Sequence, residues 1–213
     1  MTDLYDVLPY PTRAEVRLHI ENLRTRAALN GFTAAPPEAA RVLEIGCGNG
    51  FNLAPMAECY PGATFIGLDL CNSAIELGTR LAGEANLRNL ELRCLDLQQV
   101  DPAAMSSEFG TFDYVIAHGV YSWVPEDVRE AVWRLAQAVL SPNGIFYLSY
   151  NALPGWYAAQ IARDFIGFIH RDGASREDTL HRAWDAFGVF SACTEEHHPL
   201  VEEASGIRYR PQS

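Results

Sequence analysis

The stretch RVLEIGCGNG, residues 41–50, contains the pattern that decides the fold. Residues 41–46 predict a buried β-strand, because the apolar residues Val42, Leu43 and Ile45 dominate a short run that ends in glycine. The glycines that follow predict a tight turn in which the backbone can approach a ligand closely. A strand followed by a glycine-rich turn is typical of the first unit of a doubly wound α/β sheet.

The segments downstream continue this alternation. Further strands are predicted at residues 64–70, 90–97, 112–120 and 144–151. Helical patterns lie near residues 52–60, 73–85, 126–140, 156–170 and 176–190. Strands alternating with helices predict an α/β fold, a doubly wound and mostly parallel Rossmann-like sheet with helices on both faces. After residue 151 the sole strand pattern is a weak one at 206–209, so we expect the sheet to be incomplete at its C-terminal strands.

Two regions flank the predicted sheet. Thr12 and Glu15 have the spacing of a capping box and predict a helix over residues 12–30, which packs on the core or covers a cleft. The chain is therefore divided into three regions. Residues 1–40 form an N-terminal helical lid or cap, and residues 41–151 form a ligand-binding core. Residues 152–213 form a helical extension, which is a candidate acceptor or regulatory region.

The charged residues exclude several mechanisms. All sixteen basic residues are arginine, and the formal net charge is −11. Without lysine there is no Walker A lysine, no Schiff-base lysine and no pyridoxal-phosphate anchor. The acidity argues against nucleic acid as a partner, because phosphate binding needs clustered positive charge. It suits a basic partner, such as a lysine-bearing protein or a small amine.

Cysteine usage and hydropathy bear on the cellular compartment. The five cysteines form no C-x-x-C pair, so we expect neither a metal site nor a disulfide framework, and a cytoplasmic location fits best. Cys47 is interpreted as a small residue in the glycine turn rather than as a nucleophile. No signal peptide is recognised, and no apolar run reaches the roughly 20 residues of a membrane span, so no membrane partner is expected.

The glycine loop indicates a class of ligand. A dinucleotide fingerprint would need glycine at position 51, which is Phe51. Glu44 stands at the end of the first strand, where a carboxylate suits a cationic group better than a pyrophosphate. S-adenosylmethionine carries an ammonium and a sulfonium and no phosphate. We therefore expect it to be held by Glu44 together with the loop residues Gly46, Gly48, Asn49 and Gly50.

Acidic residues also end the next two strands. Asp69 lies nineteen residues after Gly50, where a carboxylate can accept hydrogen bonds from both ribose hydroxyls, and Leu70 would lie along the adenine. Asp96 could accept from the adenine amino group, with Leu97 against the ring. Either Asp could instead be a helix cap, but three acids that end three successive strands favour a ligand site.

Several short motifs carry a resemblance to a known family. Four motifs match one subgroup of the class I S-adenosylmethionine-dependent methyltransferases. They are HGVYSWVP at residues 118–125, SYNALPGW at 149–156, Asn52-Leu53 and Pro55-Met56. Over roughly residues 41–151 the chain resembles the protein-lysine methyltransferases that carry a methyltransferase regulatory domain, which include rickettsial enzymes that modify outer-membrane protein. The resemblance implies S-adenosylmethionine as cofactor and an amine on a protein as acceptor.

The fourth strand faces the sulfonium in that fold, which makes its end the candidate transfer region. His118 could contact the cofactor or accept a proton, and Tyr121 with Trp123 could form aromatic walls around an alkylammonium. His118 and Tyr121 are therefore the candidate catalytic residues. A purely structural role remains the alternative for each.

Three rival functions stay open. The chain could act on a small molecule, or it could bind the cofactor without catalysis. A nicotinamide-dependent oxidoreductase is disfavoured by Phe51 and Glu44. The sequence gives no oligomeric state.

Overall fold

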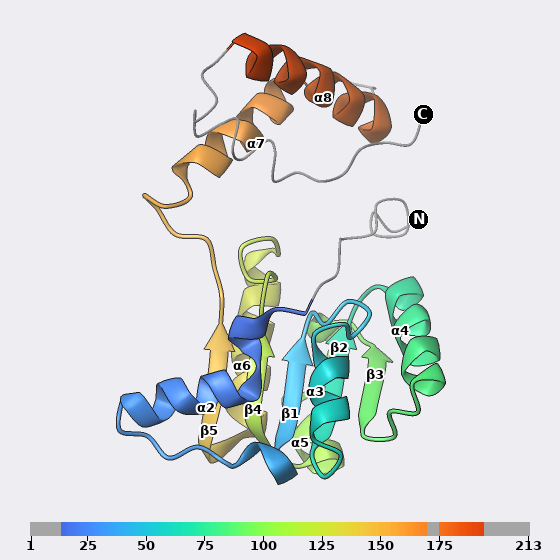
Figure 1. The fold of residues 1–213 in the computed structure, drawn as a ribbon, viewed down its shortest axis with the longest axis vertical. Helices are drawn as coiled ribbons and strands as arrows, with labels where there is room; N and C mark the ends of the chain where they lie inside the picture. The colour runs from blue at the N-terminus through green and yellow to red at the C-terminus, as the bar shows by residue number, and fades with distance from the viewer. Residues whose placement is uncertain (1–13, 170–174, 194–213) are drawn as a thin grey trace. The chain divides into compact units, whose positions relative to one another are not determined.

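The computed structural model describes residues 14–169 and 175–193 (Figure 1). By its internal contacts the chain divides into two compact units, residues 1–150 and 151–213. Thr12 and the strand pattern at 206–209 lie outside the described residues.

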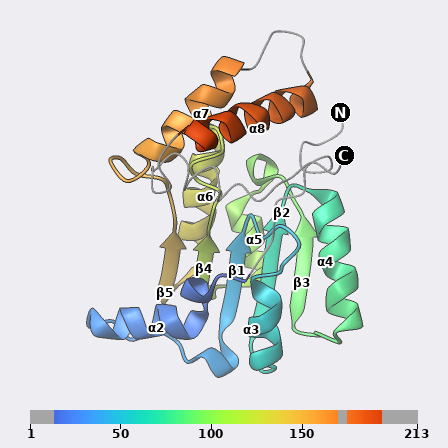
Figure 2. The same cartoon turned by 45° about the horizontal axis from the view of Figure 1, so that its top comes forward.

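A five-stranded sheet forms the centre of the first unit, and it confirms the predicted α/β fold. Its strands are β1 Arg41–Ile45, β2 Thr64–Asp69, β3 Leu90–Cys94, β4 Phe112–Ala117 and β5 Leu140–Leu148. The strand order is β3-β2-β1-β4-β5, and every neighbouring pair is parallel. All the carboxyl ends therefore meet at one edge, as the arrowheads in Figure 2 show. The order reverses between β1 and β4, which is where sheets of this type bind ligands.

Helices cover both faces of this sheet. They are α2 Ile20–Leu29, α3 Leu53–Cys59, α4 Asn72–Glu84, α5 Pro102–Phe109 and α6 Glu126–Val139. Short 3₁₀ turns occur at η1 Val16–Leu18, η2 Pro37–Ala39 and η3 Leu97–Gln99. Strand side chains alternate between two apolar clusters. Val42 packs toward α2 and α3, whereas Leu43 packs toward α5 and α6.

The N-terminal helix differs from its prediction. It begins at Ile20, with His19 as N-cap, rather than near residue 12. Glu15 caps the separate turn η1 instead, where its carboxylate accepts from the backbone N–H of Arg17. The break has a packing reason. Two residues of a continuous helix spaced by two positions lie about 200° apart, but Leu18 and Ile20 are both buried in the same cluster.

A further helix, α5, was missed by the sequence analysis. Asp101 caps it by accepting from the backbone N–H of Ala103, Pro102 occupies its first turn, and Gly110 ends it at φ +72°. These are ordinary start and stop signals. The helix fills the crossover between the parallel strands β3 and β4.

The second unit contains two helices, α7 Tyr157–Ile169 and α8 Arg176–Cys193, near the predicted positions. They contact one another, and Thr179 and Ala183 of α8 are buried. Within the described parts of both units, no helix is long and apolar enough to cross a membrane. The same residues include no group of three or more His, Cys, Asp or Glu that could hold a metal ion.

Candidate functional site

The loop after β1 is built so that glycine alone fits it comfortably. Gly46, Gly48 and Gly50 have φ values of +73°, +56° and +72°, a region that other residues avoid. Space is also short, because a Cβ on Gly46 would lie 2.1 Å from Cγ2 of Val120. A Cβ on Gly50 would lie 2.8 Å from the methyl groups of Leu92. The glycines therefore let the loop turn tightly and pack closely against Val120 and Leu92 at the carboxyl edge of the sheet.

Glu44 is the buried acid of this edge. Its side chain is 4% exposed, and its Oε1 accepts a hydrogen bond of 3.0 Å from Nδ2 of Asn52. Its Oε2 is buried and has no partner among the described residues. The pKa of Glu44 is raised to about 8, chiefly by desolvation; the hydrogen bond from Asn52 opposes this rise and the charge of Asp69 adds to it. A carboxyl group with one orphaned oxygen is costly to bury and is ready for a cationic partner.

Asp69, at the end of β2, ties the glycine loop to the start of α4. Its Oδ2 accepts from the backbone N–H of Gly48 at 2.7 Å, and its Oδ1 accepts from that of Cys71 at 2.9 Å. A carboxylate has about four acceptor positions, so two remain for the predicted ribose contacts. Leu70 follows with 62% of its surface exposed, as an apolar platform beside the loop.

Asn49 and α4 complete the loop. The side chain of Asn49 accepts from the backbone N–H of Phe51 at 3.3 Å. α4 lies so close to the loop that a Cβ on Gly78 would meet the Asn49 carbonyl oxygen at 2.2 Å. The loop is thus held from both sides rather than projecting into solvent.

Asp96 caps the turn that follows β3. Its Oδ1 accepts from the backbone N–H of Gln98 and its Oδ2 from the side chain of Gln99, each at 3.0 Å. Leu97 is partly buried and packs against the apolar cluster under α5 and α6. The cap is therefore present, while the adenine contacts expected of both residues stay a prediction.

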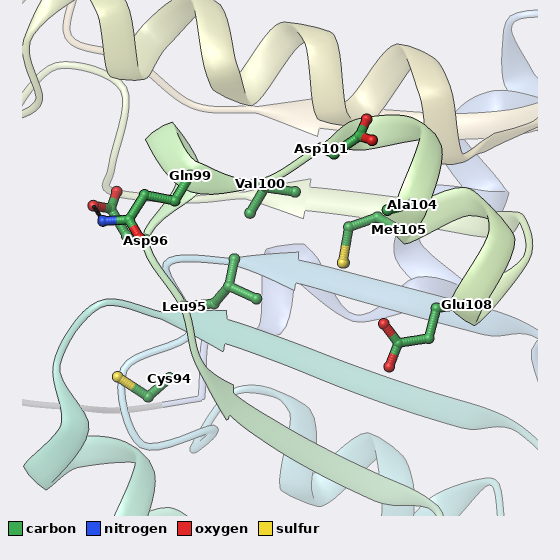
Figure 3. Close-up of a pocket in the computed structure, with 9 residues that line it drawn as sticks. All are labelled: Cys94, Leu95, Asp96, Gln99, Val100, Asp101, Ala104, Met105 and Glu108. Carbon is green, nitrogen blue, oxygen red and sulfur yellow. Dashed lines mark hydrogen bonds between the residues drawn. The ribbon is translucent and has the colours of Figure 1, made fainter.

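A hollow of about 370 Å³ adjoins Asp96 between the end of β3 and α5. Figure 3 shows Leu95, Val100 and Met105 around its middle, with Asp96 at one end and Glu108 at the other. Its volume lies within the range of small-molecule pockets.

His118 follows β4, next to the glycine loop in the sheet register. Its Nδ1 is buried and has no partner among the described residues, and its ring centroid lies 6.3 Å from that of Tyr147. Desolvation lowers the pKa of His118, the charge of Glu15 raises it, and that of Arg17 lowers it. A neutral imidazole with an open nitrogen is able to accept a proton.

Tyr121 belongs to an aromatic group near the ends of β4 and β5. Its hydroxyl oxygen accepts from the indole N–H of Trp133 at 3.2 Å, and its ring meets Tyr150 edge-on at 6.3 Å. The guanidinium carbon of Arg129 lies 5.7 Å from its ring centroid. Trp123 is 52% exposed. The phenol is therefore tied to α6, and Arg129 lies against its ring.

Sequence reasoning missed the roles of Asn52 and Glu15. Asn52 stood in a matched motif without an assigned role, yet it contacts the buried Glu44. Glu15 was expected to cap a helix, yet its backbone N–H donates to Asn52. Both contacts are tertiary, so no local pattern could have revealed them.

Known proteins share this arrangement. Residues 43–146 match the family described as a methyltransferase domain. The uncharacterized protein RP028 of Rickettsia prowazekii is 36% identical over 179 residues, which cover 84% of this chain and 70% of that protein. The chain belongs to the methyltransferases. Its class is the S-adenosylmethionine-dependent class I, as the predicted resemblance implied.

Two further relatives refine the comparison. The structure of PKMT2 from Rickettsia typhi in complex with AdoHcy matches with a TM-score of 0.78 and 33% identity, over 95% of this chain. The chain spans 39% of that longer protein. EEF1A lysine methyltransferase 2 of Danio rerio is 32% identical over 118 residues, which are 53% of this chain and 48% of that protein.

The site's own geometry fits the family cofactor, S-adenosylmethionine. The orphaned Oε2 of Glu44 suits an ammonium, and the glycine loop lies at the carboxyl edge of the sheet, where sheets of this type bind ligands. The Glu44 carboxyl group does not favour a phosphate, because its ionised form would repel one.

Proposed function

We propose that this methyltransferase moves the methyl group of S-adenosylmethionine to an amine nitrogen on a protein, with a lysine side chain as acceptor. The buried Glu44 with its unpartnered Oε2 is the observation on which the proposal chiefly rests, because such an oxygen suits a cationic cofactor. The lysine acceptor is supported by the predicted family resemblance and by the name of the Danio rerio relative.

The acidic and leucine residues of the predicted cofactor site each receive a role in this proposal. Glu44 holds the ammonium, and Asp69 accepts from the ribose hydroxyls with its remaining lone pairs. Leu70 offers its exposed surface to the adenine. Asp96 and Leu97 form the far side of the adenine subsite, beside the hollow of Figure 3.

Transfer requires a neutral amine. The nitrogen lone pair forms the new N–C bond, the C–S bond breaks and its electron pair stays on sulfur, and the nitrogen gives up a proton. His118 is the group that supports this step, since its lowered pKa keeps the imidazole neutral and its buried Nδ1 has no partner among the described residues. Tyr121 and Trp123 line the acceptor side, and the net charge of −11 attracts a basic protein.

We also propose a cytoplasmic location. Cys47, Cys59, Cys71 and Cys94 are free thiols in the described part of the chain, which suits a reducing compartment.

Labelled transfer to cell extract tests the acceptor class. The chain is incubated with methyl-labelled S-adenosylmethionine and three acceptor pools: whole protein, the same protein with lysines blocked by acetylation, and a small-molecule filtrate. We expect label in the whole protein and its loss on blocking. Because the chain has no lysine of its own, self-labelling at lysine gives no background.

The other outcomes separate the rivals. Label confined to the filtrate would indicate a small-molecule methyltransferase. Binding of S-adenosylmethionine without label in any pool would indicate a silent cofactor-binding domain. Binding of a nicotinamide dinucleotide in place of S-adenosylmethionine would refute the proposal.

A further inference from the structure

One side chain, that of Asn52, connects the buried end of Glu44 to the N-terminal segment. Its Nδ2 donates to Glu44 Oε1 at 3.0 Å, and its Oδ1 accepts from the backbone N–H of Glu15 at 3.1 Å. Glu15 precedes Asn52 by 37 residues. A single amide group therefore joins β1, the start of α3 and the segment that leads into η1.

This use of Asn52 is unusual for its position. Asn52 stands at the N-cap of α3, where asparagine ordinarily bonds to the first free N–H groups of the helix. Its backbone is already helical, at φ −78° and ψ −35°, and its side chain makes no capping bond. The capping contribution, about 1 kcal/mol at a typical helix, is absent here, while both ends of the amide serve tertiary contacts.

The N-terminal segment is fastened on the far side of Glu15 as well. Leu18 and Ile20 are buried beneath it, at 1% and 0% exposure, and Nδ2 of Asn22 donates to the carbonyl of Val16 at 2.7 Å. Glu15 and Arg17 are also close enough to His118 for their charges to act on it. The segment thus lies beside both the Glu44 end and the His118 end of the cofactor site.

We propose that Asn52 is a positioning residue that holds the Glu44 carboxyl group so that its unpartnered Oε2 is left for the cofactor, and that it couples cofactor binding to the ordering of residues 15–18. This inference rests on the proposed function. A cation at Oε2 favours the ionised carboxylate, so the bond from Asn52 becomes charge-assisted. The polarised Asn52 amide then accepts a stronger hydrogen bond from the backbone N–H of Glu15. By thermodynamic linkage, cofactor binding favours the ordered form of residues 15–18, and this ordered form favours cofactor binding to the same extent.

The test combines calorimetry with hydrogen exchange. S-adenosylhomocysteine is titrated into the wild type, Asn52→Ala, Asn52→Asp and the control Asn30→Ala, which removes an exposed asparagine bonded only to its own helix at the Arg26 carbonyl. We expect Asn52→Ala to bind about tenfold more weakly or worse, and Asn30→Ala to bind as the wild type does. In the wild type the ligand should slow amide exchange in residues 15–18, and this slowing should vanish in Asn52→Ala.

Asn52→Asp separates the two halves of the contact. Aspartate keeps an acceptor for the Glu15 N–H, but it has no donor for Glu44 and adds a like charge. Exchange of residues 15–18 in the free protein should therefore stay near the wild type, while affinity falls at least as far as in Asn52→Ala. This variant and the wild-type exchange data decide the question even where Asn52→Ala fails to fold.

Failure of the two proposals can be told apart. A wild type that does not bind S-adenosylhomocysteine refutes the proposed function. A wild type that binds normally, together with an Asn52→Asp affinity equal to it or exchange in residues 15–18 that ignores the ligand, refutes the role of Asn52 alone.

Discussion

The Glu44→Gln variant tests whether the buried carboxyl group of β1 lowers the stability of the free protein while it strengthens ligand binding. Burial raises the pKa of Glu44 from 4.5 to about 8. The pKa of Glu44 is higher in the folded protein than in the unfolded chain, so the folded protein binds the proton more tightly. The contribution of this proton to the free energy of unfolding is therefore fully present below pH 4.5 and is lost as the pH rises toward 8. Glutamine does not ionise, so the variant should gain stability over the wild type across this window.

The magnitude follows from the size of the shift. Each unit of pH well inside the window changes the free energy of unfolding by about 1.4 kcal/mol. The slope is smaller near the two pKa values, so the advantage of the variant should grow by roughly 3.5 kcal/mol between pH 5 and pH 8. In a domain of this size that corresponds to a rise in Tm of about 10 °C. Binding should change in the opposite sense. Losing the charged contact to the ammonium should weaken S-adenosylhomocysteine about ten- to a hundredfold.

Thermal unfolding at pH 5, 6, 7 and 8 checks the first effect, and calorimetric titration checks the second. The matched control is Glu58→Gln, on the exposed side of α3, which should show neither. A difference in Tm that does not grow with pH would refute the desolvation argument. An unchanged affinity would remove Glu44 from the cofactor site.

Three further substitutions test the rest of the site. Gly46→Ala should destabilise the fold by roughly 2 kcal/mol or more in urea titrations, because its Cβ would clash with Val120 at a positive φ. Asp69→Ala should cost about 1–3 kcal/mol of cofactor binding by calorimetry, and equal affinity would exclude Asp69 from ribose recognition. Tyr121→Phe removes the acceptor of the Trp133 indole and should lower the transfer rate while sparing cofactor affinity. A rate equal to that of the wild type would show that the phenol plays no part in transfer.

The strands were predictable because each is a short apolar run with a clear end. All five predicted strands form, and the helices α3, α4 and α6 begin and end within one residue of their expected bounds. The N-terminal helix was less accessible to pattern reasoning. Val16 lies within the predicted helix, yet it is 74% exposed. Leu18 and Ile20 are buried in one cluster, which a continuous helix would not allow, so the chain breaks at His19.

The candidate site was predictable at its strand ends but not in its contacts. Parallel strands bring Glu44, Asp69 and His118 to one edge whatever the details of packing. What each side chain meets there is a tertiary property. The bond between Glu44 and Asn52 depends on how the loop closes, and the bond from Asn52 to Glu15 depends on how η1 docks.

Side chains in β1 and β4 alternate between the two faces of the sheet, and the two faces should differ in how far substitutions on them affect ligand binding. Leu43, Ile45, Val115 and Ala117 point into the purely apolar layer under α5 and α6, whereas Glu44 reaches the start of α3 on the opposite face. Repacking the part of this layer that lies away from Leu97 and from Met105, which lines the hollow, should alter heat resistance and leave ligand affinity alone. An engineer who wants a sturdier catalyst should therefore begin with the interior of that layer and leave the opposite side untouched.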